Sequence, residues 1–518
     1  MELHRIIAPL ACLALALGPA GCGTEVERIP GQQSRIDLRI STPPYQDAFA
    51  DVASLRALLW RPDAEPIEHV VDGSATEFVL TGAPAAGMVL RLEGLDIDGQ
   101  LVASGQSPPF DLEPGQAAEV GLLFARVGEL TPLLGELNHA RFGHRLAVTA
   151  GDRVLVFGGA GGGSPDAPAD LVPPEIYDPH SQSSCGFGNF DCPSFSGADM
   201  RIGHSTTATA AGDVLVFGGR GPNGTLVETV LVYDAGRQDF RRLGGLDPQR
   251  VQPRADHAAV VLQVEDPGDN PYREAILIAG GRLADDRITE NGLLFDTRLE
   301  TFFRTDLQLR HGRSRHTATV FGAEQRLVLI AGGTGAGGLV AAVELFNGTD
   351  FQAINPAGAD TSAALAQPRI AHVAAARDDG VLIAAGSDGL RSLDAPERFV
   401  FNAPQGTGVL ALEVAAAHPA HTPRSAPLAA PLAGGGLLLA GGVADDGFER
   451  RLLSSAEVLT IQPDLAQAGF AEAPPLRMPW AHAAAARLNG GGVVLCGGLT
   501  SGPAGEQASA AVWYFNPG

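Results

Sequence analysis

Histidine is the residue type in this chain with the clearest chemical potential, because a neutral imidazole can ligate a metal or act as a general base near neutral pH. The chain has 13 histidines, and six of them recur at one place, shortly before an apolar run. These six are His144, His204, His257, His316, His372 and His482. A catalytic residue is needed only once, so this recurrence indicates packing and hydrogen bonding with a neighbouring arginine rather than catalysis.

Metal binding has two further sets of candidates. His418 and His421 lie three residues apart, but a zinc site needs additional ligands that the neighbouring sequence does not supply. The acid pairs Asp285-Asp286, Asp378-Asp379 and Asp445-Asp446 offer the oxygen ligands that calcium prefers. They lack EF-hand spacing, and Asp-Gly is ordinary turn chemistry. We therefore expect no metal site.

Glycine-rich segments are the remaining candidates for cofactor chemistry. Gly161-Gly162-Gly163 and Gly335-Ala336-Gly337-Gly338 each follow an expected strand and precede no evident helix, so they lack the array of backbone N–H groups that cradles a phosphate. No Gly-x-Ser-x-Gly nucleophile elbow occurs among the expected strands. We expect no cofactor and assign no catalytic residue.

The elements that carry the recurrent histidines form a repeat. An apolar run that closes on glycine occurs seven times, beginning with Val154 to Gly159 (VLVFGG), and each last glycine lies 60, 62, 52, 53, 56 and 56 residues after the previous one. Such a period indicates a repeat architecture. The closing glycines are Gly158, Gly159, Gly218, Gly219, Gly280, Gly281, Gly332, Gly333, Gly386, Gly441, Gly442, Gly497 and Gly498. The arginine three residues before the histidine position is Arg141, Arg201, Arg254, Arg313, Arg369 or Arg424; Pro427 replaces the histidine after Arg424, and His482 lacks its arginine.

A strand with an aromatic or leucine residue, often followed by Asp or Asn, completes each unit, as in Tyr177-Asp178. Together, Arg-x-x-His, the apolar strand ending in Gly-Gly and the Tyr-Asp strand resemble kelch repeats over residues 128–518. The resemblance implies a seven-bladed β-propeller. The residues agree with it, because an apolar run that does not alternate must be covered on both faces, and its terminal glycines permit positive φ where backbones crowd.

The two ends of the repeat region are expected to pair. The last repeat stops at Gly518 without the outer strand that the other repeats have, and the segment from Leu130 to Leu137 has the character of such a strand. An unpaired edge would be prone to pairing with other chains. We therefore predict that this segment pairs with the C-terminal repeat.

Residues 35–127 are expected to form a separate small domain. Short extended runs separated by turns predict an antiparallel β-sandwich, which resembles the immunoglobulin-like or transthyretin-like modules of secreted bacterial proteins. The expected strands are Ile36–Ile40, Leu55–Trp60, Glu77–Leu80, Met88–Leu95 and Glu119–Phe124.

The N-terminus has the features of an export signal. An apolar run from Ile6 to Leu17 follows Arg5 and is too short to span a bilayer, which suits a signal peptide over residues 1–21. The next residues, Gly18-Pro19-Ala20-Gly21-Cys22, resemble the bacterial lipobox, which implies lipidation of Cys22 and a flexible lipid-anchored linker over 22–34. Ordinary signal peptidase cleavage near Ala20 is the alternative, and it would give a secreted protein.

Export also bears on the other cysteines. Cys185 and Cys192 flank a short loop, and an oxidising compartment favours a disulfide between them. Two unpaired thiols are the alternative.

Composition excludes some partners. With 518 residues and 45% hydrophobic residues the chain can bury a large core, and 66 glycines and 37 prolines require frequent turns. The formal net charge of −23 has the wrong sign for gripping nucleic acid or anionic lipid. We expect no nucleic-acid partner, and contact with a membrane only through the lipid anchor.

A complete repeat without a singular reactive group favours a binding scaffold. We expect an outer-membrane or cell-surface lipoprotein, monomeric, that presents propeller loops to a protein or polysaccharide. The candidate loops are Ala160 to Pro174, His180 to Asp199 and Gln263 to Arg273. The alternative is an extracellular carbohydrate-active enzyme, a lyase, isomerase or hydrolase, with its site in the central funnel. Acids, arginines or tyrosines converging there from several blades would favour the enzyme, whereas a funnel of Ala, Gly and Ser would count against it.

Overall fold

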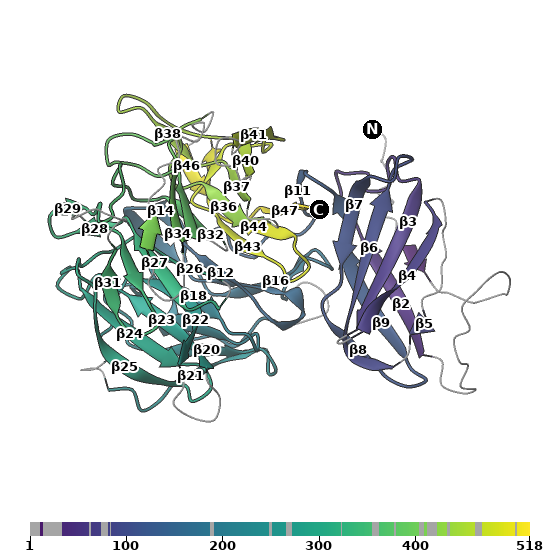
Figure 1. Ribbon diagram of the computed structural model, residues 1–518, viewed down its shortest axis with the longest axis horizontal. Helices are drawn as coiled ribbons and strands as arrows, with labels where there is room; N and C mark the ends of the chain where they lie inside the picture. Colours follow the sequence, from purple (N-terminus) through teal and green to yellow (C-terminus); the bar gives the residue numbers. More distant parts are fainter. Residues whose placement is uncertain are drawn as a thin grey trace.

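The chain folds almost entirely into β-strands. Its structure is a computed structural model that describes residues 11–13, 34–61, 64–73, 81–82, 84–186, 191–247, 251–265, 272–322, 324–354, 362–377, 380–402, 409–411, 422–432, 436–460, 469–502 and 505–518. Among these residues there is no α-helix, and only two 3₁₀ turns, Ala150–Asp152 and Gly197–Asp199, interrupt the strands and loops. The expected all-β class is confirmed (Figure 1).

Two sheets form the N-terminal module, drawn in purple and blue on the right of Figure 1. Buried residues alternate along the strands, so each sheet turns one face towards a shared core that includes Ile36, Leu38, Leu90 and Leu92. The first sheet contains β1 (Ala11–Leu13), β2 (Ser34–Ser41), β5 (Thr81–Gly82) and β9 (Ala117–Leu123). The second contains β3 (Ser54–Arg61), β4 (Ala64–Asp72), β6 (Ala85–Leu95), β7 (Leu101–Gln106), β8 (Phe110–Leu112) and β10 (Ala125–Arg126).

Strand pairing in this module corrects one expectation. The module is not wholly antiparallel, because β2 and β9 run parallel, with Arg35 opposite Ala117 and Ser41 opposite Leu123. A parallel pair needs a long crossover, and here strands β3 to β8 provide it. Four of the five expected strands are present as β2, β3, β6 and β9. The fifth, Glu77–Leu80, lies outside the described residues, as does the proposed lipid-bearing Cys22.

Seven four-stranded antiparallel sheets make up the rest of the chain, and we call them repeats 1 to 7. Each contains the glycine-terminated run as its second strand. The strands of repeats 1 to 4 are β12 (Arg145–Val148), β13 (Val154–Phe157), β16 (Glu175–Asp178) and β17 (Ser183–Ser184); β18 (Ser205–Ala208), β19 (Val214–Phe217), β20 (Leu231–Asp234) and β21 (Asp239–Arg242); β22 (Ala258–Glu265), β23 (Tyr272–Ala279), β24 (Asn291–Asp296) and β25 (Thr301–Gln308); and β26 (Thr317–Phe321), β27 (Leu327–Ala331), β30 (Glu344–Phe346) and β31 (Phe351–Ala353). Those of repeats 5 to 7 are β32 (Val373–Arg377), β33 (Gly380–Ala384), β34 (Glu397–Asn402) and β35 (Val409–Ala411); β36 (Leu428–Pro431), β37 (Leu437–Ala440), β40 (Ala456–Thr460) and β41 (Gly469–Ala473); and β43 (Ala484–Arg487), β44 (Val493–Cys496), β47 (Val512–Phe515) and β11 (Leu130–Pro132).

The second strand of a repeat is buried on both faces because each face belongs to a different core. In β13, Val154 and Val156 pack with residues of repeat 7, whereas Leu155 and Phe157 pack with residues of repeat 2. All four side chains are therefore buried. This explains why the apolar run does not alternate with polar residues.

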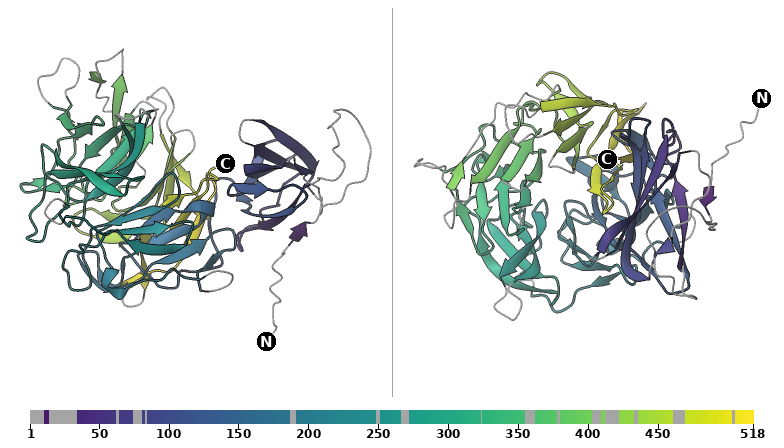
Figure 2. Two further views of the ribbon diagram at one scale, coloured as in Figure 1. Left: turned by 90° about the horizontal axis from the view of Figure 1, so that it is seen from below. Right: turned by 45° about the vertical axis from the view of Figure 1, so that its right-hand side comes forward.

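Successive repeats also touch through their first strands. β12 contacts β18, the contacts continue through β22, β26, β32 and β36 to β43, and β43 contacts β12. The two views in Figure 2 show neighbouring sheets side by side along this series.

The predicted pairing of the two ends of the repeat region is confirmed. β11 pairs antiparallel with β47, so that Leu130 lies opposite Phe515 and Pro132 opposite Trp513. The backbone N–H groups of Leu133 and Leu137 extend the contact by donating to the carbonyls of Val512 and Ala510. The outer strand that repeat 7 lacks in sequence is thus supplied from the segment that precedes repeat 1.

Asn516 joins the last repeat to the N-terminal module. It is buried, and its Nδ2 donates to the carbonyl oxygens of Ala125 at 2.7 Å and Ser104 at 3.1 Å. Its own carbonyl accepts the N–H of Gly128. The chain terminus, marked C in Figure 1, therefore lies against the module.

Small hairpins extend the loops that follow four of the glycine pairs. They are β14 (Ala160–Ser164) with β15 (Ala167–Leu171), β28 (Thr334–Gly335) with β29 (Gly338–Leu339), β38 (Val443–Asp445) with β39 (Arg450–Leu452), and β45 (Leu499–Gly502) with β46 (Gly505–Ala508) and β42 (Trp480–Ala481). We call the end of the repeats that carries the glycine pairs and these hairpins the glycine face.

Candidate functional site

The six repeat arginines are fully buried beside the glycine pairs. In repeat 1, the guanidinium of Arg141 donates through Nη1 to the carbonyl of Gly158 at 3.0 Å, through Nε to the carbonyl of His139 at 3.2 Å, and through Nη2 to Glu175. Loss of solvation lowers the pKa of each buried guanidinium, to about 10 for Arg201 and Arg254, so all six stay charged at neutral pH. These arginines have a structural role, because their guanidinium groups are buried and donate to acceptors within the same repeat.

The sequence analysis missed the partners of these arginines. In repeats 1 to 6 the third strand, or in repeat 2 the residue two positions before it, supplies an acceptor for Nη2, and the acceptors are Glu175, Thr229, Asn291, Glu344, Glu397 and Glu457. Four of them are glutamates that stand two residues before the aromatic or leucine residue of the strand, as Glu175 does before Tyr177. That spacing was the available signal.

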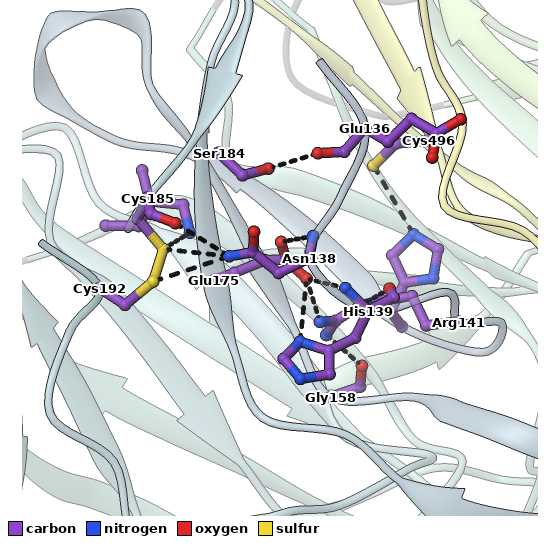
Figure 3. A network of polar contacts seen from close by, with 12 residues as sticks. Glu136, Asn138, His139, Arg141, Gly158, Glu175, Ser184, Cys185, Cys192 and Cys496 are labelled. Atoms are coloured by element: carbon purple, nitrogen blue, oxygen red, sulfur yellow. Dashed lines mark hydrogen bonds and ion pairs between the residues drawn. A yellow bond between two sulfur atoms is a disulfide. The ribbon is translucent and has the colours of Figure 1, made fainter. Parts of the chain in front are cut away.

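Within the described residues, no hydrogen bond joins the side chain of a repeat histidine to the guanidinium of a repeat arginine, although His257 and His372 lie against the backbone of Arg254 and Arg369. Three of the histidines reach the neighbouring repeat: His257 Nε2 lies 2.9 Å from Ser205 Oγ, and His372 Nε2 lies 2.9 Å from Thr317 Oγ1. His144 Nε2 lies 3.9 Å from Cys496 Sγ, so it connects repeat 1 to repeat 7 (Figure 3). A side chain on Gly158 would collide with the carbonyl of Arg201 and the ring of His204, which explains the glycine there.

Repeat 7 departs from the pattern, and the sequence analysis assigned its histidine position to the wrong residue. Trp480 occupies the arginine position, since its indole N–H donates to the carbonyl of Gly497 as Arg141 does to Gly158. Ala483 occupies the histidine position, because it packs against Gly498 as His144 packs against Gly159. His482 is therefore not the repeat histidine, and it belongs to a different set.

That set contains one residue per repeat, two positions before the first strand. All seven have left-handed backbones: Gly143 (φ 68°), Gly203 (71°), Asp256 (56°), Arg315 (55°), Ala371 (51°), Ala426 (46°) and His482 (54°). Backbone hydrogen bonds connect several of them across repeats, from Asp256 to Gly203, from Arg315 to Asp256, from Ala426 to Ala371 and from His482 to Ala426. Left-handed conformations cost about 1 kcal/mol or more for residues other than glycine. At three of these positions the strained backbone carries a charged or titratable side chain.

Charged side chains from several repeats meet around these residues. The Asp256 carboxylate lies 3.9 Å from the Nε atoms of both Arg282 and Arg315, and Arg315 Nη1 lies 3.8 Å from Asp166, at the tip of the β14–β15 hairpin. Repeats 1, 3 and 4 thus contribute to one network. We call Asp166, Asp256, Arg282, Arg315 and His482 the charged mouth.

Arg145 lies below the charged mouth, at the start of β12. Its side chain is exposed, yet loss of solvation lowers the pKa of its guanidinium, while the charge of Asp256 raises it. It also depresses the pKa values of His144, His204 and His257, which come from three successive repeats. Arg145 therefore lies close to the buried histidines of repeats 1, 2 and 3.

His482 is held neutral at physiological pH. Loss of solvation lowers its pKa most, the charges of Arg450 and Arg315 lower it further, and Glu506 and Asp166 oppose them. The imidazole therefore lies among two arginines and two acids, all on the glycine face. Neutral imidazole can accept or donate a hydrogen bond to a ligand.

The described acid pairs take part in an ion pair and in turns. Asp286 pairs with Arg220 at 2.5 Å, and Asp445 and Asp446 accept backbone N–H groups within their own turn, as turn chemistry requires. His418, His421 and the pair Asp378-Asp379 lie outside the described residues. Within the part of the chain that is described, no three His, Cys, Asp or Glu side chains are grouped to hold a metal ion.

Cys185 and Cys192 form a disulfide near the first repeat arginine (Figure 3). Asn138 Nδ2 donates to the Cys185 carbonyl at 2.9 Å and its backbone N–H donates to Glu175 at 2.5 Å, so the bridge, Asn138 and the acid that holds Arg141 form one network. Cys496 is unpaired and buried, and burial raises the pKa of its thiol, so it is not a reactive thiolate.

Removing this disulfide is expected to lower stability moderately. Replacing both cysteines with serine should reduce the free energy of unfolding by about 2 kcal/mol, because the bridge closes a short loop. Urea denaturation of the wild type and of C185S/C192S measures the difference. The control is reductant, which should destabilise the wild type alone; equal sensitivity of both proteins would contradict the prediction.

Comparisons with known proteins leave the chain without an assigned family. No protein-family model matches the sequence, and no curated protein matches it significantly. In the described part of the structure, moreover, no helix is long and apolar enough to cross a bilayer. Functional conclusions therefore depend on the geometry of the glycine face.

Proposed function

We propose that residues 128–518 form a seven-bladed kelch-type β-propeller, that residues 35–127 form an immunoglobulin-like or transthyretin-like sandwich, and that the whole acts as a binding scaffold. The seven four-stranded sheets, the contact between β43 and β12, and the pairing of β11 with β47 support the ring. The resemblance of Arg-x-x-His and Gly-Gly to kelch repeats supports the family.

The scaffold is proposed to be exported and held on the cell surface through lipid on Cys22. The lipobox-like sequence before Cys22 supports this address, and the Cys185–Cys192 disulfide is in keeping with an oxidising compartment. A C22S variant would then appear in the soluble fraction rather than with membranes, and a wild type without attached lipid would overturn the anchor.

One observation carries the binding function: charged side chains from several repeats converge on the glycine face, where the hairpins lie. The ion pairs of the charged mouth are long, near 3.8–3.9 Å. Their groups are therefore only partly satisfied by each other and can turn to a ligand. The arginines inside the repeats, by contrast, already donate hydrogen bonds to acceptors of their own repeats.

Replacing Arg315 with alanine tests this function. Arg315 lies between Asp166 and Asp256, so its loss should weaken binding to cell-surface polysaccharide or envelope protein fractions by at least about tenfold, the effect of a charge-assisted hydrogen bond. Binding is measured by interferometry with the immobilised full chain. The matched control is R298A, which removes an exposed arginine from the opposite end of the sheets, after β24. Unchanged binding by R315A would contradict the role of the charged mouth.

A carbohydrate-active enzyme is the second candidate, and His482 favours it. A neutral imidazole close to acids and arginines from repeats 1, 4, 6 and 7 has the composition of a general base and its supporting charges. In that case the chain should cleave or isomerise a polysaccharide, and H482A should abolish turnover. Absence of turnover by the wild type on a broad panel of polysaccharides would remove this candidate.

A further inference from the structure

A concave site lies on the glycine face next to the charged mouth, since its lining residue Ile288 pairs with Arg282. It is a pocket of about 670 Å³ between repeats 3 and 4, within the size range of small-molecule sites. The ends of β24 and β25 and the loop after Gly281 form its floor and one wall, and Ala336, in the turn between β28 and β29, lies on the other side. Its main polar side chains are those of Gln252, Arg287, Glu290, Thr305 and Gln308.

Several of these polar groups are unused by the protein. Asn291 in the pocket is already committed, since its Oδ1 accepts from Arg254 and its Nδ2 donates to the carbonyl of Thr305. Within the described residues, in contrast, no hydrogen bond engages the side chains of Gln252, Glu290 or Gln308, which are all exposed. The pocket therefore presents unused donors and acceptors on side chains at the end of β25 and in the neighbouring loops.

The chemistry of the pocket defines its ligand. Two carboxamides each offer a donor and an acceptor. Arg287 is already paired with Asp285, with Nε 3.4 Å from Oδ2, so the carboxylate of Glu290 is the charge that the lining leaves open and an anionic ligand would be repelled. A neutral ligand rich in hydroxyl groups, each of which both donates and accepts, satisfies amides, carboxylate and guanidinium together.

We infer that this pocket binds a neutral sugar residue of a glycan. The inference deepens the proposed scaffold function by naming its ligand class, and it rests on that function. Gln252 and Gln308 hydrogen-bond the sugar hydroxyls, Glu290 accepts from them, and the small side chain of Ala336 leaves the pocket open on its far side. The charged mouth then contacts a separate part of the ligand or a separate partner.

A panel of short neutral gluco-, galacto- and manno-oligosaccharides tests the inference, with affinity measured by calorimetry on the full chain. The Q252A/Q308A variant should weaken the best-binding oligosaccharide by about tenfold or more, because two hydrogen bonds are lost. A336F should block binding by filling the pocket while keeping every polar group. The matched control is Q352A, which removes an exposed amide from β31 in the neighbouring repeat and should bind normally.

The outcomes separate the pocket from the wider function. Binding of a neutral oligosaccharide that A336F and Q252A/Q308A lose and Q352A keeps supports the inference. Oligosaccharide binding that survives both pocket variants but is lost in R315A overturns the pocket and leaves the scaffold in place. Absence of oligosaccharide binding by a wild type that still binds an envelope protein also overturns the pocket alone. A wild type that binds no fraction at all contradicts the scaffold and the pocket together.

Discussion

Replacing Glu344 with alanine should destabilise the chain by about 3–5 kcal/mol, because it leaves a buried guanidinium without its counter-charge. Arg313 and Glu344 are both buried, and their Nη2–Oε1 distance is 2.6 Å. Glu344 also accepts the backbone N–H groups of Arg310 at 2.7 Å and His311 at 3.2 Å, so one carboxylate holds the arginine and the loop that leads to the charged mouth. The free energy of unfolding from urea denaturation measures the loss.

Two variants separate this effect from general sensitivity to charge. D286A breaks an ion pair with Arg220 at the exposed surface, and it should cost less than about 1 kcal/mol. E344Q keeps the shape and one acceptor, so its cost should lie between the two. A loss of under 1 kcal/mol in E344A would show that the buried pair contributes little and that the third-strand acid is not a structural element of the repeat.

Mild acid should unfold the chain, because burial lowers the pKa of five repeat histidines. The pKa falls to about 3 for His144, His257 and His372, and well below its usual value for His204 and His316, with desolvation as the largest cause in each. In the unfolded chain each of these histidines binds a proton as the pH falls through about 6.5, whereas in the folded chain it does not. Stability is therefore complete above pH 6.5 and is lost as the pH falls towards 3. Each histidine contributes about 1.4 kcal/mol per pH unit.

The slope of the free energy of unfolding against pH, taken between pH 6 and pH 5, measures this effect. Most carboxylates titrate at lower pH and contribute little to it. The slope should correspond to at least about five protons bound on unfolding, because burial also lowers the pKa values of His180 and His482, which add to those of the five repeat histidines. H372Q removes one titrating ring while keeping a hydrogen-bonding group for Thr317, so its slope should fall by about one proton. A wild-type slope below one proton would contradict the prediction.

Local sequence was sufficient for the glycine-terminated strands of the repeats and their order along the chain. Runs such as Val154–Phe157 identify strands buried on both faces, and the spacing of the glycine pairs gives the number of repeats. The missing outer strand of the last repeat predicted the pairing of β11 with β47, because an open edge of hydrogen-bonding groups is unfavourable. The parallel pairing of β2 and β9 escaped prediction, since strands far apart in sequence carry no local mark of their direction.

The repeat alignment failed where two side chains changed together. With tryptophan in place of arginine and alanine in place of histidine, repeat 7 kept only His482 as a familiar residue, and the alignment moved by one position. The structure corrects this because the Trp480 indole bonds to the same carbonyl that an arginine reaches in the other repeats. A hydrogen bond can be kept by a different residue type, and a sequence pattern records only the residue type.

By itself the sequence determined the all-β class, the seven sheets, and the glycines where neighbouring backbones crowd, because these follow from local hydrophobic pattern and from steric limits on φ. Only the tertiary structure decided which side chains meet. Asp166, Asp256 and Arg315 are up to about 150 residues apart and lie together at the charged mouth, and Gln252, Gln308 and Ala336 border one pocket from separate loops. Such meetings depend on how whole sheets pack against one another, and no short stretch of chain contains that information.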